Sequence, residues 1–164
     1  MAVRIKRKRR WIPWTLAAIV FLILFVAVDD PRRDFVENQA TMTEDSPDPL
    51  LRPIVFDRSA DELVEVTRDA GRRIRNWDYI GTVKIGDAST VVFERTSRWL
   101  QLKDDIIIRV EDLGPRCRVT GESRSRLEFG DLGQNPRNLR RIVNELFVVL
   151  ANRPESTRPA THTH

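Results

Sequence analysis

The sequence has little of the residue types on which several common site chemistries depend. It contains one cysteine, Cys117, and two histidines, His162 and His164. A single cysteine excludes an internal disulfide and any multi-cysteine metal site. Because both histidines lie at the C-terminal end, no imidazole is left to serve as a base for a serine or cysteine nucleophile in the core. Glycine-rich phosphate loops and zinc-type spacings are also missing. We therefore expect no metal and no cofactor.

Negative charge is missing from the first ten residues, which hold six of the 28 basic side chains of the chain. From Asp29 to the C-terminus there are 22 basic and 24 acidic residues, so this part has a net charge of −2. The formal net charge of +4 therefore comes from the N-terminal tail and not from the region that is able to fold. A non-specific nucleic-acid binder needs a basic surface on the domain itself, so we expect no nucleic-acid partner.

The run from Trp11 to Val28 contains no charged residue, and eleven of its 18 residues are Leu, Ile, Val or Phe. As a helix it would be about 27 Å long, which is close to the hydrocarbon thickness of a bilayer. We predict one N-terminal transmembrane helix over residues 11–28, with the lipid bilayer as its partner. The basic residues precede the run, so the positive-inside rule places residues 1–10 in the cytoplasm. Bulky Phe25 lies two positions before Ala27, which disfavours signal-peptide cleavage, and we predict an uncleaved anchor.

Composition divides the rest of the chain into three parts. Residues 29–50 are acidic, contain three prolines and lack apolar periodicity, so they are predicted to be a tether. Residues 51–152 are predicted to form one soluble α+β domain, followed by a polar tail, 153–164, that is predicted to be disordered. In this arrangement the protein is a single-pass protein of the bacterial inner membrane, with its domain in the periplasm.

Two helices and several strands are predicted within the domain. Ser59 and Glu62 form a capping-box pattern before an apolar stripe that runs to about Arg75. Asn135 suits the N-cap of a second helix, with Pro136 as its first helical residue. The apolar face of this helix is predicted to consist of Leu139, Ile142, Val143, Leu146 and Leu150. Strand-like runs separated by turn residues occupy 53–56, 77–85, 90–95, 100–102, 105–110 and 116–127.

The last strand alternates, with Cys117, Val119 and Leu127 on one face and arginines on the other. Such alternation is typical of an antiparallel sheet that is covered on one side only. Cys117 is therefore predicted to be a small buried apolar residue and not a nucleophile. We predict an antiparallel sheet of about four to five strands with two helices packed on one face.

Polar residues recur in order around these last strands and the second helix. An Asp-Asp pair precedes a strand with an arginine, Ser-x-Ser-Arg follows, and Asp-x-Gly-x-Asn opens the helix. The residues are Asp104, Asp105, Arg109, Ser123, Ser125, Arg126, Asp131, Gly133 and Asn135. Over roughly residues 50–150 this arrangement resembles domain-of-unknown-function family 1499. The resemblance implies membership and a shared fold, and it implies no activity. The chain departs from the family pattern at Leu102, Glu122, Glu128 and Asn138, and Glu122 reverses the charge of the usual arginine.

Three interpretations of these nine residues stay open. In the first they are structural, with the acids shaping turns, Asn135 capping its helix and Arg126 pairing with a neighbouring acid. In the second they bind an anion, such as a lipid-derived phosphate or carboxylate, at the helix N-terminus near Gly133. In the third, Asp104 or Asp105 and Asp131 act as base and acid of a carboxylate-dependent hydrolase.

We favour a membrane-anchored envelope protein whose extracytoplasmic domain binds a partner and is not an enzyme. The expected partner is another envelope protein or an anionic, lipid-derived ligand. The carboxylate-dependent hydrolase is the alternative.

Overall fold

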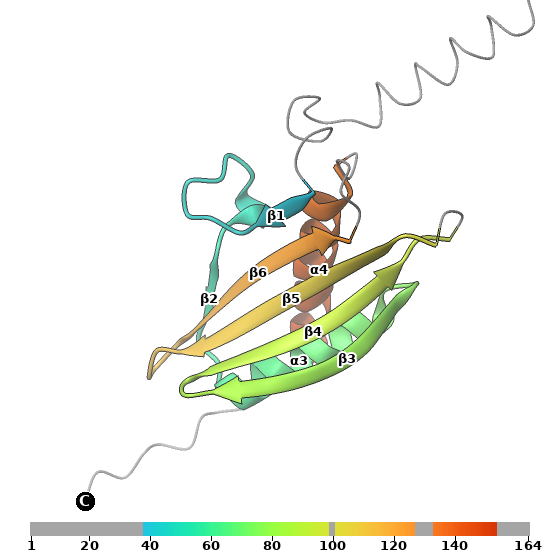
Figure 1. The fold of residues 1–164 in the computed structure, drawn as a ribbon. Helices are drawn as coiled ribbons and strands as arrows, with labels where there is room; N and C mark the ends of the chain where they lie inside the picture. Colours follow the sequence, from blue (N-terminus) through green and yellow to red (C-terminus); the bar gives the residue numbers. More distant parts are fainter. Residues whose placement is uncertain (1–37, 99–100, 127–132, 154–164) are drawn as a thin grey trace, which may run out of the picture.

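The structure, a computed structural model, describes residues 38–98, 101–126 and 133–153. These residues form a six-stranded antiparallel sheet, two helices and one 3-10 turn (Figure 1). The elements are β1 (Gln39–Thr41), η1 (Pro49–Leu51), β2 (Ile54–Phe56), α3 (Ala60–Arg73), β3 (Trp77–Ile85), β4 (Ala88–Thr96), β5 (Lys103–Asp112), β6 (Cys117–Ser125) and α4 (Gln134–Ala151).

Residues 11–28, the predicted transmembrane helix, lie outside the described part of the chain. Neither of the helices within that part is long and apolar enough to cross a bilayer.

The sheet has the order β1-β6-β5-β4-β3, and every pair of strands is antiparallel. The short strand β2 also pairs with β6, with Val55 opposite Arg118, whereas β1 pairs further along it, with Thr41 opposite Glu122. Because β5 occupies the other side of β6, β1 and β2 share one edge of the sheet. The opposite edge is β3.

Helix α3 follows the pattern that the sequence predicts. The Ser59 hydroxyl accepts a hydrogen bond from the Glu62 amide and so caps the first turn. The predicted apolar stripe is buried against the sheet, and it comprises Leu63, Val66, Ala70 and Ile74. Gly71 lies on the same buried side, and a Cβ atom built there would come within 2.2 Å of the Phe93 ring on β4. The absence of a side chain at Gly71 therefore sets how closely the helix approaches the sheet.

Helix α4 begins two residues earlier than predicted, at Gln134 instead of Pro136. Gly133, in the left-handed conformation with φ of 73°, is the N-cap residue, and it makes no side-chain cap. The prediction that Asn135 caps the helix is wrong, because the Asn135 side chain is fully buried and hydrogen-bonds to a neighbouring strand. The apolar face is as predicted, with Leu139, Ile142, Val143 and Leu146 buried.

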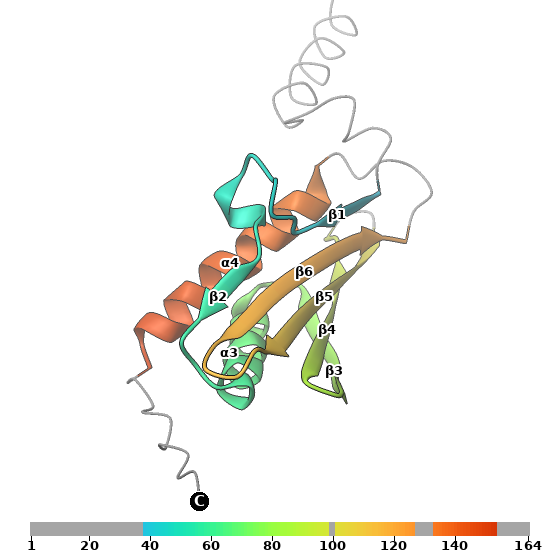
Figure 2. The same ribbon diagram turned by 90° about the vertical axis from the view of Figure 1, so that its left-hand side faces the viewer.

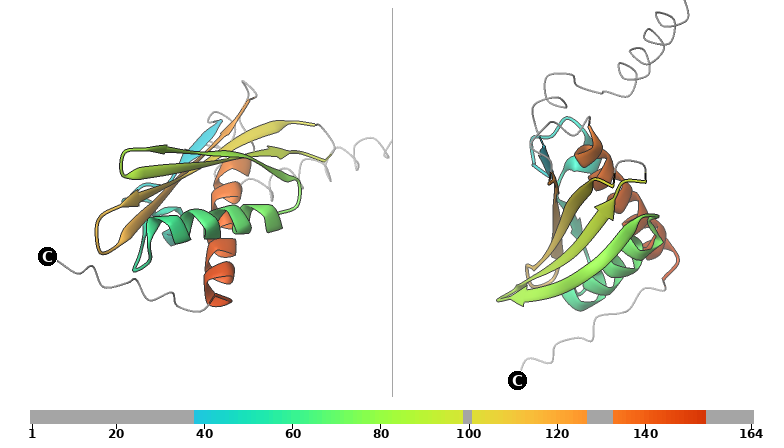
Figure 3. Two further views of the ribbon diagram at one scale, coloured as in Figure 1. Left: turned by 90° about the horizontal axis from the view of Figure 1, so that it is seen from below. Right: turned by 45° about the vertical axis from the view of Figure 1, so that its right-hand side comes forward.

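Both helices lie on the same face of the sheet and cross each other there (Figures 2 and 3). The core between the helices and the sheet contains Val91 and Phe93 of β4, Ile106 and Ile108 of β5 and Cys117 of β6. Cys117 is buried, as predicted. We call the other side of the sheet, which neither helix covers, the open face.

The predicted α+β class, antiparallel sheet and two helices are confirmed, but the predicted number of strands is too low. Strand β1 lies within residues 29–50, which composition assigned to the tether. Its three residues are too few to show a period, and they become a strand only because β6 offers a free edge. The predicted strand 105–110 lies within β5, which begins at Lys103. Of the predicted strand 100–102, residues 101 and 102 are not in a strand, and residue 100 lies outside the described residues.

Candidate functional site

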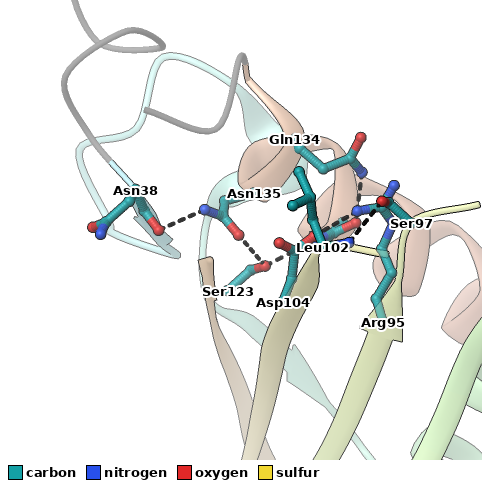
Figure 4. Close-up of polar contacts among 9 residues, drawn as sticks. Asn38, Arg95, Ser97, Leu102, Asp104, Ser123, Gln134 and Asn135 are labelled. Carbon is teal, nitrogen blue, oxygen red and sulfur yellow. Dashed lines mark hydrogen bonds and ion pairs between the residues drawn. The ribbon is translucent and has the colours of Figure 1, made fainter. Parts of the chain in front are cut away.

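A buried polar network lies where β4, β5 and β6 meet the first turns of α4 (Figure 4). We define this network by the side chains of Arg95, Asp104, Ser123, Asn135 and Asn138. Asp104 is 3% exposed, and both Ser123 and Asn135 are fully buried. Each of these polar groups would be costly to bury without a hydrogen-bonding partner.

Asp104 connects two elements of the domain. Its Oδ2 atom accepts a 2.6 Å bond from Nη1 of Arg95, which is the residue opposite it on β4. The same oxygen accepts a 3.2 Å bond from Nδ2 of Asn138 on α4. The carboxylate therefore neutralises a largely buried guanidinium and holds the helix against the sheet at the same time.

The network continues to the start of the described chain. Nδ2 of Asn138 also donates to Oγ of Ser123 at 3.1 Å, and that hydroxyl donates to Oδ1 of Asn135 at 2.7 Å. Nδ2 of Asn135 then donates to the main-chain oxygen of Asn38 at 2.7 Å, just before β1. Segments 97 residues apart in the sequence are thus joined by one amide side chain.

Two members of the network, Arg95 and Asn138, were not among the predicted site residues. A signal for Asn138 is present in the sequence, since it lies three residues after Asn135 and next to Leu139, on the buried face of the helix. Arg95 carries no such signal. Its role depends on the strand register, which places it opposite Asp104.

A second polar cluster lies on the open face. Arg126 pairs with Asp105 and with Glu94, and Glu94 also accepts a 2.6 Å hydrogen bond from Lys103. The hydrogen bond from Lys103, together with the charge of Arg126, lowers the pKa of Glu94 although partial burial opposes this. The hydrogen bond to Asp105 raises the pKa of Arg126. The cations and carboxylates of this cluster neutralise one another.

Arg109 lies further along the open face and pairs with Glu111 at 2.9 Å. It borders a shallow hollow of about 210 Å³, which is also lined by Thr90, Thr120 and Glu122. The threonines flank Arg109 on the neighbouring strands. The hollow is therefore a polar depression in the middle of the sheet.

The nine predicted site residues thus fall into separate groups. Asp104, Ser123, Ser125 and Asn135 lie on the helix-covered side, and Gly133 lies at the start of α4. Asp105, Arg109 and Arg126 lie on the open face, so the sheet separates them from the first group. Asp131 lies outside the described residues. No group of three or more His, Cys, Asp or Glu side chains within the described ranges is placed to hold a metal ion.

The fold and the network define a class of small α+β domain, in which a one-sided antiparallel sheet is fastened to its C-terminal helix by buried polar side chains. Residues 29–146 match the model of a family described as proteins of unknown function (DUF1499), and the chain belongs to this family. A comparison with curated proteins finds no match.

Proposed function

We propose that this chain is a single-pass inner-membrane protein whose extracytoplasmic domain binds another envelope protein. Residues 11–28 form the anchor, residues 1–10 stay in the cytoplasm, and the α+β domain lies in the periplasm. The support for the anchor is the uncharged run itself, with six basic residues on one side and acidic residues on the other.

The observation that carries the binding function is the open face. Apolar side chains are exposed on this face at both edges of the sheet, with Val55 on β2 at one edge and Val83 and Ile85 on β3 at the other. Ile85 is 75% exposed and Val83 is 55% exposed. Exposed apolar residues among paired charges are typical of a surface that a protein partner covers.

A protein is favoured over a small anion because three cations of this face already have partners. Arg126, Lys103 and Arg109 each pair with a carboxylate of the domain. An anion would have to displace those carboxylates, whereas a protein surface is able to keep the ion pairs at its rim.

A carboxylate-dependent hydrolase is less favoured by the geometry. A general base needs to come within hydrogen-bonding distance of the proton that it removes. Asp104 is buried and bonded to Arg95 and Asn138, and Asp105 is bonded to Arg126. The partners of both carboxylates therefore occupy the positions that a substrate would need for proton transfer.

Topology reporters test the anchor. Alkaline phosphatase fused after residue 153 of the otherwise intact chain is expected to be active, because that enzyme folds only outside the cytoplasm. Green fluorescent protein at the same position is expected to be dark when it is exported by the general secretion route. Replacing Leu22 and Leu24 with arginine places two charges within residues 11–28, at a cost of about 6 kcal/mol or more relative to leucine. This variant is expected to move the protein to the soluble fraction. A fluorescent fusion and an inactive phosphatase in the wild-type chain would overturn the location.

Charge substitutions on the open face test the binding. We expect Ile85→Asp combined with Val83→Asp to reduce formaldehyde cross-linking of the full-length protein to its partner at least tenfold, since two apolar contacts are lost. The matched control is Val148→Asp on α4, which is similarly exposed at 45% but lies on the helix side. Thermal unfolding is expected to be little changed in both variants. Equal cross-linking in both would contradict the assignment of the open face.

A further inference from the structure

A groove of about 660 Å³ lies beside β1, between that strand, the loop after it and the start of α4. Its size is within the range of ordinary ligand sites. One wall is the strand itself, and the other walls include Pro47, Leu51 and Pro136. Figures 1 and 2 show β1 at the edge of the sheet, with the loop that leads to η1 on its outer side. The groove lies beside the outer end of the buried network, at Asn38, and it borders the hollow at Arg109 only through Thr41.

The main chain of β1 presents unused hydrogen-bonding groups to this groove. The Met42 amide donates to the Gly121 oxygen, and the Ser125 amide donates to the Asn38 oxygen, both at 2.8 Å. In an antiparallel pair the hydrogen-bonded residues alternate, so the main-chain groups of Gln39 and Thr41 point away from β6. No residue in the described ranges hydrogen-bonds to these outward groups. The strand edge therefore offers two donors and two acceptors in the spacing of a sheet.

The charge of the groove favours one class of side chain. Asp45 is the one ionisable residue among those that line it. It is exposed, and no other described residue forms an ion pair with it. The neighbouring acids are already paired, Glu44 with Arg118 and Asp48 with Arg140. The negative charge at Asp45 is thus available to a cation that enters the groove.

We propose that this groove binds an extended peptide that carries a basic side chain. The peptide adds to the sheet as a further strand beside β1, with its main chain on Gln39 and Thr41 and its lysine or arginine at Asp45. Such strand addition gives affinity through the main chain and specificity through the side-chain pockets. The inference rests on the proposed function only in that the occupant is part of a protein.

The test uses the full-length protein in phosphatidylcholine nanodiscs and a phage library of random seven-residue peptides. Wild-type protein is expected to enrich peptides that contain lysine or arginine. Thr41→Pro removes one outward N–H without touching a bond to β6, because edge strands accept proline at such positions. We expect this substitution to weaken the binding of the best synthetic peptide about tenfold, because one main-chain hydrogen bond is lost and the proline ring clashes with the peptide. Thr41→Val, which keeps the N–H, is the matched control and is expected to bind as the wild type does.

Asp45→Asn tests the charge separately. It is expected to weaken the binding of the basic peptide several-fold. The binding of an analogue in which leucine replaces the basic residue is expected to stay unchanged. If Thr41→Pro lowers the melting temperature markedly, Gln39→Pro, which removes the other outward donor, takes its place.

Three results would overturn the proposal. The wild type enriches no basic peptides, or both proline variants bind the best peptide as tightly as the wild type does, or Asp45→Asn weakens the binding of the basic peptide and of its leucine analogue equally. Self-association that Thr41→Pro abolishes would instead identify a second copy of this chain as the occupant. The selection uses purified protein, so a cytoplasmic reporter signal would overturn the proposed location without affecting it.

Discussion

Replacing Gly71 with alanine is expected to lower the free energy of unfolding by about 2 to 3 kcal/mol, because overpacking a closed core costs this much. The added Cβ atom would lie 2.2 Å from Cε1 and 2.3 Å from Cζ of Phe93. Phe93 is fully buried and also contacts the rings of Trp77 and Tyr79, so its ring has little room to move. The melting temperature is expected to fall by about 10 to 20 °C for a domain of this size.

The sign of this effect separates tertiary packing from helix propensity. In an exposed helix, glycine to alanine stabilises by about 0.5 to 1 kcal/mol. A rise in melting temperature would therefore contradict the close approach of α3 to β4. Gly121→Ala is the control, since its Cβ atom would meet only flexible side-chain ends, at 3.0 Å or more.

A double-mutant cycle locates the strain. Phe93→Leu alone is expected to destabilise by about 1 to 2 kcal/mol through the volume that it removes. Combined with Gly71→Ala, it is expected to cost less than the sum of the single changes by at least about 1 kcal/mol. Simple additivity would place the strain somewhere other than this contact.

Asp104→Asn is expected to lower the free energy of unfolding by about 3 kcal/mol, as for a buried ion pair from which one partner is removed. The substitution keeps the size of the side chain and leaves the Arg95 guanidinium without a neutralising carboxylate. Asp105→Asn is the matched control on the neighbouring residue. Its pair with Arg126 is solvent-exposed, so we expect a loss below about 1 kcal/mol. Denaturant unfolding of the two variants measures both values.

The Asp104 experiment also distinguishes the structural interpretation from the catalytic one. A catalytic carboxylate can be replaced with loss of turnover and an intact fold, whereas a structural carboxylate is lost together with stability. We expect part of the stability to return when Arg95→Gln is added to Asp104→Asn, because the unpaired buried charge is then removed. Equal stability of the wild type and Asp104→Asn would contradict the structural role of the network.

Local patterns were sufficient to predict most of the secondary structure. The capping box at Ser59, the apolar stripe of α3 and the apolar face of α4 are each contained within one segment, and the structure confirms them. The same holds for strand β3 and for the alternation along β6, which predicted the burial of Cys117. In each case the period of the side chains reports which face is covered, so no distant contact is needed.

Long-range pairing decided the rest. Strand β1 has no pattern of its own and exists because β6 has a free edge, and for the same reason the groove beside it could not be predicted. Asn135 was predicted to be a cap because helix capping is a local sequence pattern. In the tertiary structure its side chain instead accepts a hydrogen bond from the hydroxyl of Ser123.

The sequence by itself determined the two helices, the one-sided sheet and the family of this protein. Only the tertiary structure decided how its polar motif is divided. Pairing with β4 extends β5 back to Lys103, so that Asp104 and Asp105 both belong to the strand. Because adjacent residues on a strand point to opposite sides, Asp104 lies in the buried network and Asp105 lies on the open face. Arg95 and Asn138 were added to the network because strand register and helix packing brought them to Asp104. Side-chain period is a property of the chain, whereas register and packing depend on which distant segments provide the most favourable burial.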